Sequence, residues 1–298
     1  MDAGRRQIAD IFTGRKVLEI PYFQRSYVWE EEQWDRLLED IYEICSTDKS
    51  HFFGSVILKQ RKTGTGDKFG DRRIVIDGQQ RLTTLNIFFK VLCLKQNLEA
   101  EFERTFKLIN KQSALIHNHN DIESFNTVLS LEKIDDIDKN DKITLCYRYF
   151  CKNIDLNRLN YDTILNNIIF IVIDLDNDED EQEIFDTINS LGVKLTTAEL
   201  LKNYFFNKDN YEMYETFWKN IFEKDEETRD YWEKEITTGR IKRTILDLFL
   251  FAYLQIKINE KSANVKTEDK LGFNRVEHLF HSYKLFIKNI AEAIKMIF

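Results

Sequence analysis

The sequence predicts an α+β fold in which a small mixed sheet accompanies a large, mainly helical body. Only one proline and 10 glycines occur among the 298 residues. So few chain breakers favour long helices over an all-β sandwich, which needs a turn roughly every 8–12 residues. A few short β-branched runs have the length and composition of strands. Hydrophobic residues make up 43% of the chain, which is enough for a sizeable core.

The sheet and its first helices are expected within residues 1–95. Residues 5–13 have the pattern of a short helix that ends at Gly14, a residue favoured just past a helix end. Residues 16–20 form a short β-prone run. The acids that begin at Glu30 suit the positive end of a helix dipole, and apolar residues follow them at helical spacing.

Two more strands and a central helix are predicted next. Residues 52–60 and 73–76 are strand candidates, and the glycine- and charge-rich residues 62–70 between them suit a hairpin loop. This loop lacks the Gly-Lys-Ser/Thr of a Walker A phosphate loop. Residues 82–94 are apolar on most faces, so this helix is expected to be buried in the middle of the domain.

The second predicted domain, residues 96–298, is mainly helical. The segment Ile168–Leu175 is nearly all Ile, Val and Phe, and we expect it to be a strand that completes the sheet. Thr196 and Glu199 form a capping box that opens another helix. The remaining pattern is helical to the last residue, so the chain is expected to be part of a longer protein.

Charge and cysteine content limit the function classes. The formal net charge of −8 does not suit a protein that grips phosphate backbones over a wide surface, although local basic sites stay open. The N-terminus lacks a signal peptide, and no run reaches the roughly 18 apolar residues of a membrane span. Without any Cys-x-x-Cys pair, the cysteines are expected to be free thiols in a cytoplasmic protein: Cys45, Cys93, Cys146 and Cys151.

One segment carries the clearest chemistry, a β-branched strand that turns directly into a helix: Ile74-Val75-Ile76-Asp77-Gly78-Gln79-Gln80-Arg81-Leu82-Thr83-Thr84. Free N–H groups at such a helix start bind anions, and Gly78 would let a phosphate approach the backbone. Arg81 could hold a phosphate, Gln79 and Gln80 a water, ribose or base, and Asp77 a magnesium ion or the attacking water. The chemistry alone leaves open that Asp77 merely caps the helix beside solvated Arg and Gln side chains.

Two other segments are weaker candidates. The first combines an arginine with aromatic residues, so Arg25 could stack on a base or bind a phosphate, or simply pair with a nearby glutamate: Ile20-Pro21-Tyr22-Phe23-Gln24-Arg25-Ser26-Tyr27-Val28-Trp29. The second contains an Asn-x-x-Gly turn, which could be ordinary capping geometry: Phe185-Asp186-Thr187-Ile188-Asn189-Ser190-Leu191-Gly192-Val193-Lys194-Leu195-Thr196.

Other site chemistries have little support. The pairs His117-x-His119 and His278-x-x-His281 have metal-like spacing, but no Cys or His cluster accompanies them, so solvated or core histidines are expected. The carboxylates of Asp174 and Asp176 could reach a metal, although an acidic loop after a strand is the simpler interpretation.

Together the three segments resemble the N-terminal domain of GmrSD-type restriction enzymes, which also occurs in the SspE and BrxU anti-phage proteins. The resemblance covers about residues 5–206 and rests on these blocks in this order: Ile20-Pro21-x-Phe23-Gln24-Arg25-x-Tyr27-x-Trp29, Phe53-Gly54-Ser55, Asp77-Gly78-Gln79-Gln80-Arg81-Leu82-Thr83-Thr84, and Asn189-x-x-Gly192 with Leu195-Thr196 and Leu201-Lys202-Asn203. The Asp-Gly-Gln-Gln-Arg (DGQQR) block is the most specific of them.

This resemblance implies a fold similar to ParB and sulfiredoxin, with the nucleotide-binding domain in residues 1–95. It implies an NTPase that uses a nucleoside triphosphate with Mg²⁺ or another divalent cation and regulates a nuclease that attacks modified DNA. The implied catalytic residues are Asp77, Gln79, Gln80 and Arg81, with Asp77 also at the metal. The implied nucleotide-binding residues are Gln24, Arg25, Gly78 and Arg81, with Asn189, Lys202 and Asn203 completing the cleft.

Two departures from the family pattern affect these expectations. Phe23 stands where the family often has tyrosine, so a hydroxyl contact would be lost while the aromatic shape is kept. The family's His-Asn-His type nuclease domain is not recognised in this chain, so cleavage is expected to need a C-terminal or separate nuclease. The alternative function is a sensor that binds modified DNA or a nuclease subunit without hydrolysis. Assembly into a homo-oligomer stays open.

Overall fold

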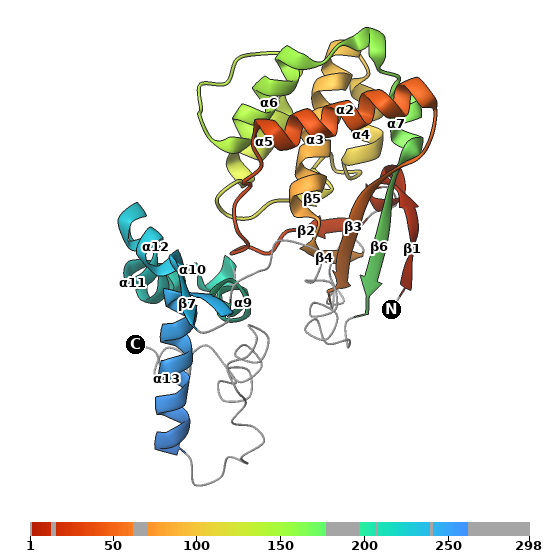
Figure 1. Ribbon diagram of the computed structural model, residues 1–298. Coiled ribbons are helices and arrows are strands. Elements are labelled where there is room, and N and C mark those ends of the chain that lie inside the picture. Colours follow the sequence, from red (N-terminus) through yellow and green to blue (C-terminus); the bar gives the residue numbers. More distant parts are fainter. Residues whose placement is uncertain are drawn as a thin grey trace. The chain divides into compact units, whose positions relative to one another are not determined.

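The computed structural model describes residues 2–12, 16–61, 71–176, 197–206, 208–238 and 241–261. The chain divides into two compact units, Met1–Glu181 (unit 1) and Gln182–Phe298 (unit 2) (Figure 1). The division expected near residue 95 falls inside unit 1. The predicted loop at residues 62–70 and the Asn189 turn lie outside the described residues.

Unit 1 is built on a six-stranded mixed sheet with the order β1-β6-β3-β4-β2-β5. Strand β6 is antiparallel to β1 and parallel to β3, β3 is antiparallel to β4, and β2 is parallel to both β4 and β5. The α+β prediction is therefore confirmed. The strands are β1 (Asp2–Gln7), β2 (Val17–Glu19), β3 (His51–Gln60), β4 (Arg72–Asp77), β5 (Leu115–Ile116) and β6 (Ile168–Leu175).

The N-terminal segment differs from its prediction. Residues 2–7 form strand β1, and the helix expected over residues 5–13 begins only at Ile8. The polar side chains of β1 have no strand pattern of their own, but the strand forms an antiparallel ladder with β6, in which Arg5 lies opposite Ile171. Pairing with the apolar β6 strand therefore overrides the local preference.

The helices of unit 1 gather on one side of the sheet (Figure 1). A capping box between Glu30 and Gln33 opens α2, in agreement with the acidic start that the sequence predicts. Helix α3 is buried along nearly its whole length, also as predicted, and packs against α4 and α6. The helices are α1 (Ile8–Phe12), α2 (Glu31–Thr47), α3 (Gln79–Gln96), α4 (Glu99–Phe106), α5 (Ile122–Ser130), α6 (Lys142–Asn153), η1 (Leu156–Arg158) and α7 (Tyr161–Asn167).

The helices of unit 2 pack around buried aromatic side chains, among them Trp218 and Phe222. The hairpin of β7 and β8 departs from the helical pattern predicted for the last part of this mainly helical domain, because Ile236, Thr237 and Thr238 are β-branched and favour a strand. The elements are α9 (Thr197–Phe205), η2 (Lys208–Asn210), α10 (Tyr211–Met213), the π-helical turn η3 (Tyr214–Lys219), α11 (Asn220–Phe222), α12 (Glu226–Glu233), β7 (Glu235–Thr238), β8 (Ile241–Thr244) and α13 (Ile245–Lys261).

The four cysteines are free thiols, as predicted. Among the described helices, none combines the length and the apolar character that crossing a bilayer requires.

Candidate functional site

The DGQQR block forms the turn from β4 into α3. Strand β4 ends at Asp77, and Gly78 is the N-cap of α3 with φ of +99°. No side chain caps this helix, so the interpretation of Asp77 as the cap is wrong. A Cβ atom at Gly78 would lie 2.9 Å from Cγ2 of Val56 in β3, so both the backbone angle and the packing require glycine here. The first intrahelical bond runs from the Leu82 N–H to the Gly78 carbonyl, which leaves the earlier amides without helical partners.

Arg81 connects this turn to the neighbouring strand β3. Its Nη2 donates to the Ser55 carbonyl at 2.6 Å and to Oδ2 of Asp77 at 3.1 Å. The side chain of Arg81 is 27% exposed and that of Asp77 45% exposed, so the pair lies at the surface of the sheet end. The structure thus brings the Phe53-Gly54-Ser55 and DGQQR blocks into direct contact.

The two glutamines of the block hold the chain segment around Arg25. Gln80 accepts a hydrogen bond from the Val28 N–H at 2.9 Å and donates to the Ser26 carbonyl at 3.2 Å. Gln79 donates to the Arg25 carbonyl at 3.4 Å, while its buried Oε1 has no partner. Both polar atoms of Gln80 are therefore used in positioning residues 26–28, whereas Gln79 keeps a free acceptor.

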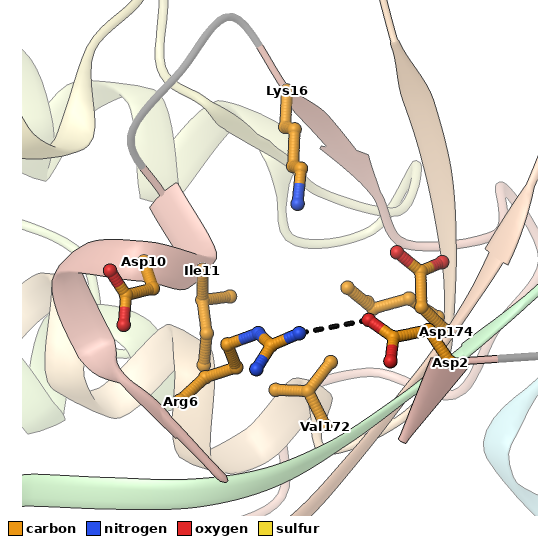
Figure 2. A pocket seen from close by; sticks show the side chains of 8 residues that line it. Asp2, Arg6, Asp10, Ile11, Lys16, Val172 and Asp174 are labelled. Atoms are coloured by element: carbon orange, nitrogen blue, oxygen red, sulfur yellow. Dashed lines mark hydrogen bonds and ion pairs between the residues drawn. The ribbon is translucent and has the colours of Figure 1, made fainter. Parts of the chain in front are cut away.

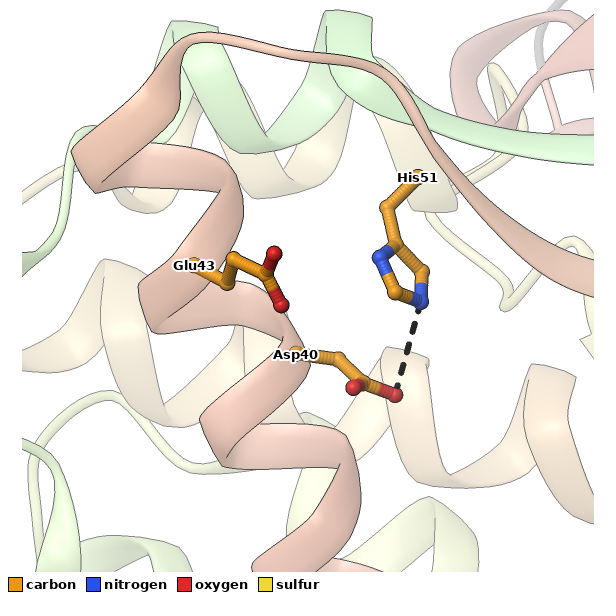
Figure 3. Close-up of side chains that lie close together, drawn as sticks. All are labelled: Asp40, Glu43 and His51. Atoms are coloured by element: carbon orange, nitrogen blue, oxygen red, sulfur yellow. Dashed lines mark ion pairs between the residues drawn. The ribbon is translucent and has the colours of Figure 1, made fainter.

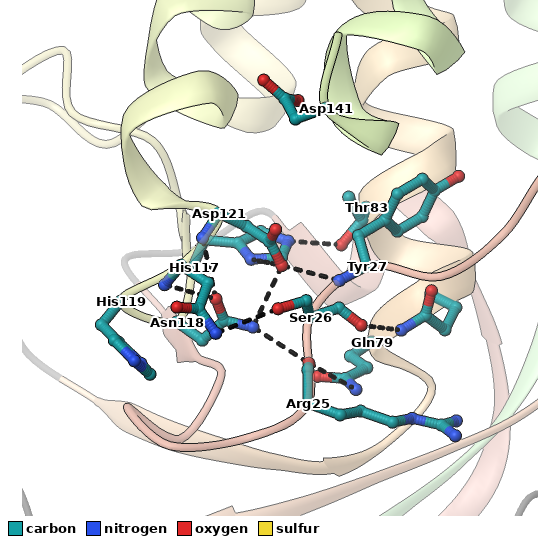
Figure 4. Close-up of polar contacts among 12 residues, drawn as sticks. Arg25, Ser26, Tyr27, Gln79, Thr83, His117, Asn118, His119, Asp121 and Asp141 are labelled. Carbon is teal, nitrogen blue, oxygen red and sulfur yellow. Dashed lines mark hydrogen bonds and ion pairs between the residues drawn. The ribbon is translucent and has the colours of Figure 1, made fainter. Parts of the chain in front are cut away.

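Arg25 has an unsatisfied guanidinium nitrogen beside this helix start. Its carbonyl is fixed by Gln79 and Asn118, but its Nε is buried without a partner. The pairing with a nearby glutamate that the sequence left open does not occur within the described part of the chain. Figure 4 shows the side chain pointing away from the loop that carries Asn118. The preceding residue, Gln24, is buried.

A loop that the sequence analysis missed supports the Arg25 segment from the other side (Figure 4). Asn118 donates to the Arg25 carbonyl at 3.0 Å and to Oδ2 of Asp121 at 3.1 Å. The same Asp121 oxygen accepts the Tyr27 N–H at 2.7 Å. The Asn and Asp three residues apart, typical of side chains that fix local backbone, were the available signal.

Tyr27 is the buried centre of these contacts. Its hydroxyl group lies 2.6 Å from Oγ1 of Thr84 and accepts a hydrogen bond from Nε1 of Trp34 at 2.7 Å. Burial raises the pKa of Tyr27 well above its ordinary value, so the phenol stays neutral. Tyr27 and Thr84, which belong to two different sequence blocks, therefore form structural contacts beneath the site.

His117 lies in the core, in agreement with the expectation that the histidines are solvated or core residues rather than metal ligands. Its Nε2 is 2.8 Å from Oγ1 of Thr83, and its Nδ1 is 3.6 Å from Oδ2 of Asp121. Burial lowers the pKa of His117 to about 3, so the folded protein holds a neutral imidazole. Unfolded histidine titrates near pH 6.5, so between that pH and about 3 the unfolded state binds more protons. The free energy of unfolding should therefore fall as the pH falls through this window, by at most about 2 kcal/mol at pH 5 from His117.

Burial raises the pKa of Asp121, which offsets part of this loss because the folded carboxyl gains its proton more readily. Urea unfolding of wild type and His117→Gln between pH 7.5 and 5 measures the effect. The substituted protein should show the shallower pH dependence, and His119→Gln serves as the control for removing a histidine. If the free energy of unfolding of His117→Gln depended on pH as steeply as that of wild type, His117 would not be the buried neutral histidine that causes the pH dependence.

The third sequence block is only partly described. Asn189 lies in residues that the structure does not describe, whereas Lys202 and Asn203 belong to α9 of unit 2. Lys202 donates to Oε1 of Glu223 at 2.7 Å. Burial acts to raise the pKa of Glu223, but Lys202 and three hydrogen bonds outweigh it and the pKa is lowered. The Lys202 ammonium is thus already paired within unit 2, and its role at a nucleotide stays a prediction.

Three metal-ligand side chains converge elsewhere, where α2 ends and β3 begins (Figure 3). Ligand atoms of Asp40, Glu43 and His51 lie within 4.8 Å of one another, and His51 Nε2 is 3.6 Å from Oδ2 of Asp40. Over the described ranges no other such group occurs. Asp77 therefore offers a single carboxylate, and a metal there would need ligands from the nucleotide.

Asp174 forms an ion pair with Arg73. Its Oδ1 lies 2.9 Å from Nε of Arg73 in β4. It also lines a small polar hollow beside β1, in which Arg6 pairs with Asp2 at 2.8 Å (Figure 2). Asp2 lies directly opposite Asp174 in the β1–β6 ladder, but Arg73 pairs with Asp174 and the basic side chains of Arg6 and Lys16 line the same hollow. Cations of the protein thus already offset these carboxylates, which favours the structural interpretation over a metal site.

Comparison with known proteins identifies the family. A search of curated proteins finds no match. A family model described as the GmrSD restriction endonuclease, N-terminal domain, matches residues 8–206, which is more than half of the chain and contains the whole β4–α3 turn. The chain therefore belongs to the family of GmrSD restriction endonuclease N-terminal domains.

Proposed function

We propose that the chain binds a nucleoside triphosphate at the β4–α3 turn and hydrolyses it with a divalent cation, thereby regulating the nuclease of a restriction system. The observation that carries this proposal is the start of α3. Its N-cap is Gly78, no side chain caps it, and two arginines flank it. Uncapped N–H groups at the positive end of an 18-residue helix attract phosphate oxygens.

Local charge supports an anionic ligand. A triphosphate carries about four negative charges near neutral pH, and a chain of net charge −8 must offset them at the site. Arg25 has a buried Nε without a partner, and Arg81 uses Nη2 for protein contacts while Nη1 has no hydrogen bond among the described residues. The arginines and the α3 amides together supply donors for phosphate.

Asp77 fits the role of a single protein ligand to magnesium. Only Oδ2 contacts Arg81, and the side chain is nearly half exposed. Mg²⁺ is commonly held by one or two carboxylates together with substrate phosphates and waters. A bound cation would neutralise charge that develops on the transferred phosphoryl group. Asp77 itself would orient the attacking water, and the unpartnered Oε1 of Gln79 would accept a hydrogen bond from the nucleotide.

A phosphate-release assay tests the proposal. Purified chain with magnesium should release phosphate from at least one of ATP, GTP, CTP and UTP at a rate above Arg81→Ala. Because both proteins are purified identically, the difference between their rates excludes phosphate released by contaminating phosphatases. Equal rates at protein concentrations that bind nucleotide would overturn hydrolysis.

A sensor without turnover is the second candidate. It is favoured because both polar atoms of the Gln80 amide are hydrogen-bonded to the backbone and Arg81 is paired with Asp77. These contacts leave few groups for catalysis. On this proposal the chain would bind nucleotide, modified DNA or a nuclease subunit, and the family relation supports a nuclease as partner. Binding of a triphosphate without phosphate release would select the sensor.

A further inference from the structure

We propose that Gly54 in β3 controls nucleotide binding by setting the orientation of Arg81 and the space beside its Nη1. The inference rests on the proposed function, because it concerns the same arginine. Gly54 lies outside the DGQQR block and contributes no side chain to a ligand. It would therefore be a positioning residue that acts through Arg81.

Strand β3 is irregular at this point. Phe52 pairs with Ile169, and Ser55 pairs with Ile171. Between these two pairs, β3 has two residues, Phe53 and Gly54, whereas β6 has one. Such a bulge bends the strand and takes a residue out of the regular ladder. Gly54 lies within the bulge with φ of +106°, a backbone angle that strongly favours glycine. The next carbonyl, that of Ser55, accepts the 2.6 Å hydrogen bond from Arg81.

The guanidinium of Arg81 lies against the bare Cα of Gly54. A Cβ atom there would be 3.0 Å from Nη1 and 3.2 Å from Cζ of Arg81. An arginine can usually move aside, but this one is fastened through Nη2 to Ser55 and Asp77. A side chain at position 54 would therefore push the guanidinium by a few tenths of an ångström and strain its hydrogen bond to the Ser55 carbonyl.

The available donors of Arg81 explain why its orientation matters. Nη2 is used twice by the protein, and Nε is buried without a partner, so Nη1 is the group left to bind an anion. Because Gly54 borders Nη1, its missing side chain keeps that approach open. The bulge thus anchors one amine of Arg81 and leaves the other for phosphate.

The test is a double-substitution cycle with Gly54→Ala, Arg81→Ala and the combined protein. Calorimetric titration with the magnesium complexes of ATP, GTP, CTP and UTP gives Kd, and thermal unfolding gives Tm. Gly54→Ala should raise Kd at least tenfold in the wild-type background and less than twofold in the Arg81→Ala background. Gly4→Ala is the matched control, since its Cβ would also approach an arginine, Arg6 at 3.1 Å, at an ordinary backbone angle.

The outcomes separate the two proposals. Equal losses of affinity from Gly54→Ala in both backgrounds, or an unchanged Kd in a folded Gly54→Ala protein, would overturn the role of Gly54. If wild type binds none of the triphosphates, the proposed function fails. In that case the Tm values still test the contact between Gly54 and the Arg81 guanidinium. Gly54→Ala should lower Tm less in the Arg81→Ala background than in wild type, and equal drops in the two backgrounds would overturn the contact.

Discussion

Arg81→Ala is expected to raise the Kd of a nucleoside triphosphate by about ten- to a hundredfold. Each hydrogen bond to a charged group contributes roughly 1.5–3 kcal/mol, and about 1.4 kcal/mol corresponds to a tenfold change in Kd. The substitution removes the donor side chain and also the tie between the β4–α3 turn and the Ser55 carbonyl. Both effects act in the same direction on phosphate binding.

Asp77→Ala is expected to behave differently, with most of the binding retained and turnover abolished. It removes one acceptor of Arg81 but leaves the shorter contact to Ser55, so the arginine keeps its position. It also removes the only acid of the turn, which is the candidate for holding magnesium and positioning water.

Titration calorimetry beside phosphate release checks both expectations. Arg61→Ala is the matched control, because Arg61 also pairs with a carboxylate, that of Glu19, beyond the far end of β3. It should alter neither Kd nor rate. Normal hydrolysis by Asp77→Ala together with normal binding by Arg81→Ala would show that the turn has only a structural role.

Gly78→Ala should lower the free energy of unfolding by about 2–5 kcal/mol. Holding an alanine at positive φ costs about 1–2 kcal/mol, and overpacking a filled core adds roughly 1–3 kcal/mol. The clash here is with Val56, which is fully buried and whose β-branched side chain has little freedom to turn away.

Urea unfolding measured by circular dichroism gives this value, provided that the slope with denaturant stays that of wild type. A loss below about 1 kcal/mol would mean that the turn relaxes easily, which contradicts a rigid contact between position 78 and Val56. Gly4→Ala, at an ordinary backbone angle in β1, should change the stability far less.

The elements that the sequence predicted well are those whose pattern is decided locally. Strand β6 is a nearly continuous apolar run, and residues 82–94 of α3 are apolar on most faces. The strand-to-helix turn at Gly78 follows from a glycine between a β-branched run and a helical one. The acids from Glu30 to Glu32 identified the start of α2 because capping is a short-range interaction.

The contacts that the sequence did not reveal are those made by backbone groups or by distant residues. Nothing in the sequence marks the Ser55 carbonyl as the acceptor of Arg81, or Gln80 as a clamp on residues 26–28. The support of Arg25 by Asn118 joins residues 93 positions apart. Strand β1 likewise exists only through its pairing with β6.

The position of β6 also has a consequence for how the protein is made. Residues 168–175 lie between β1 and β3, although both of those strands are synthesised more than a hundred residues earlier. A nascent chain that has reached residue 95 already contains the DGQQR turn, yet β1 has no neighbour and β3 presents an open edge. Unpaired strand edges invite association with other chains, and long-range pairing is slow to form. We therefore expect an N-terminal fragment of residues 1–95 to aggregate, and the proposed nucleotide site at the β4–α3 turn to become stable only after residue 175 has been added.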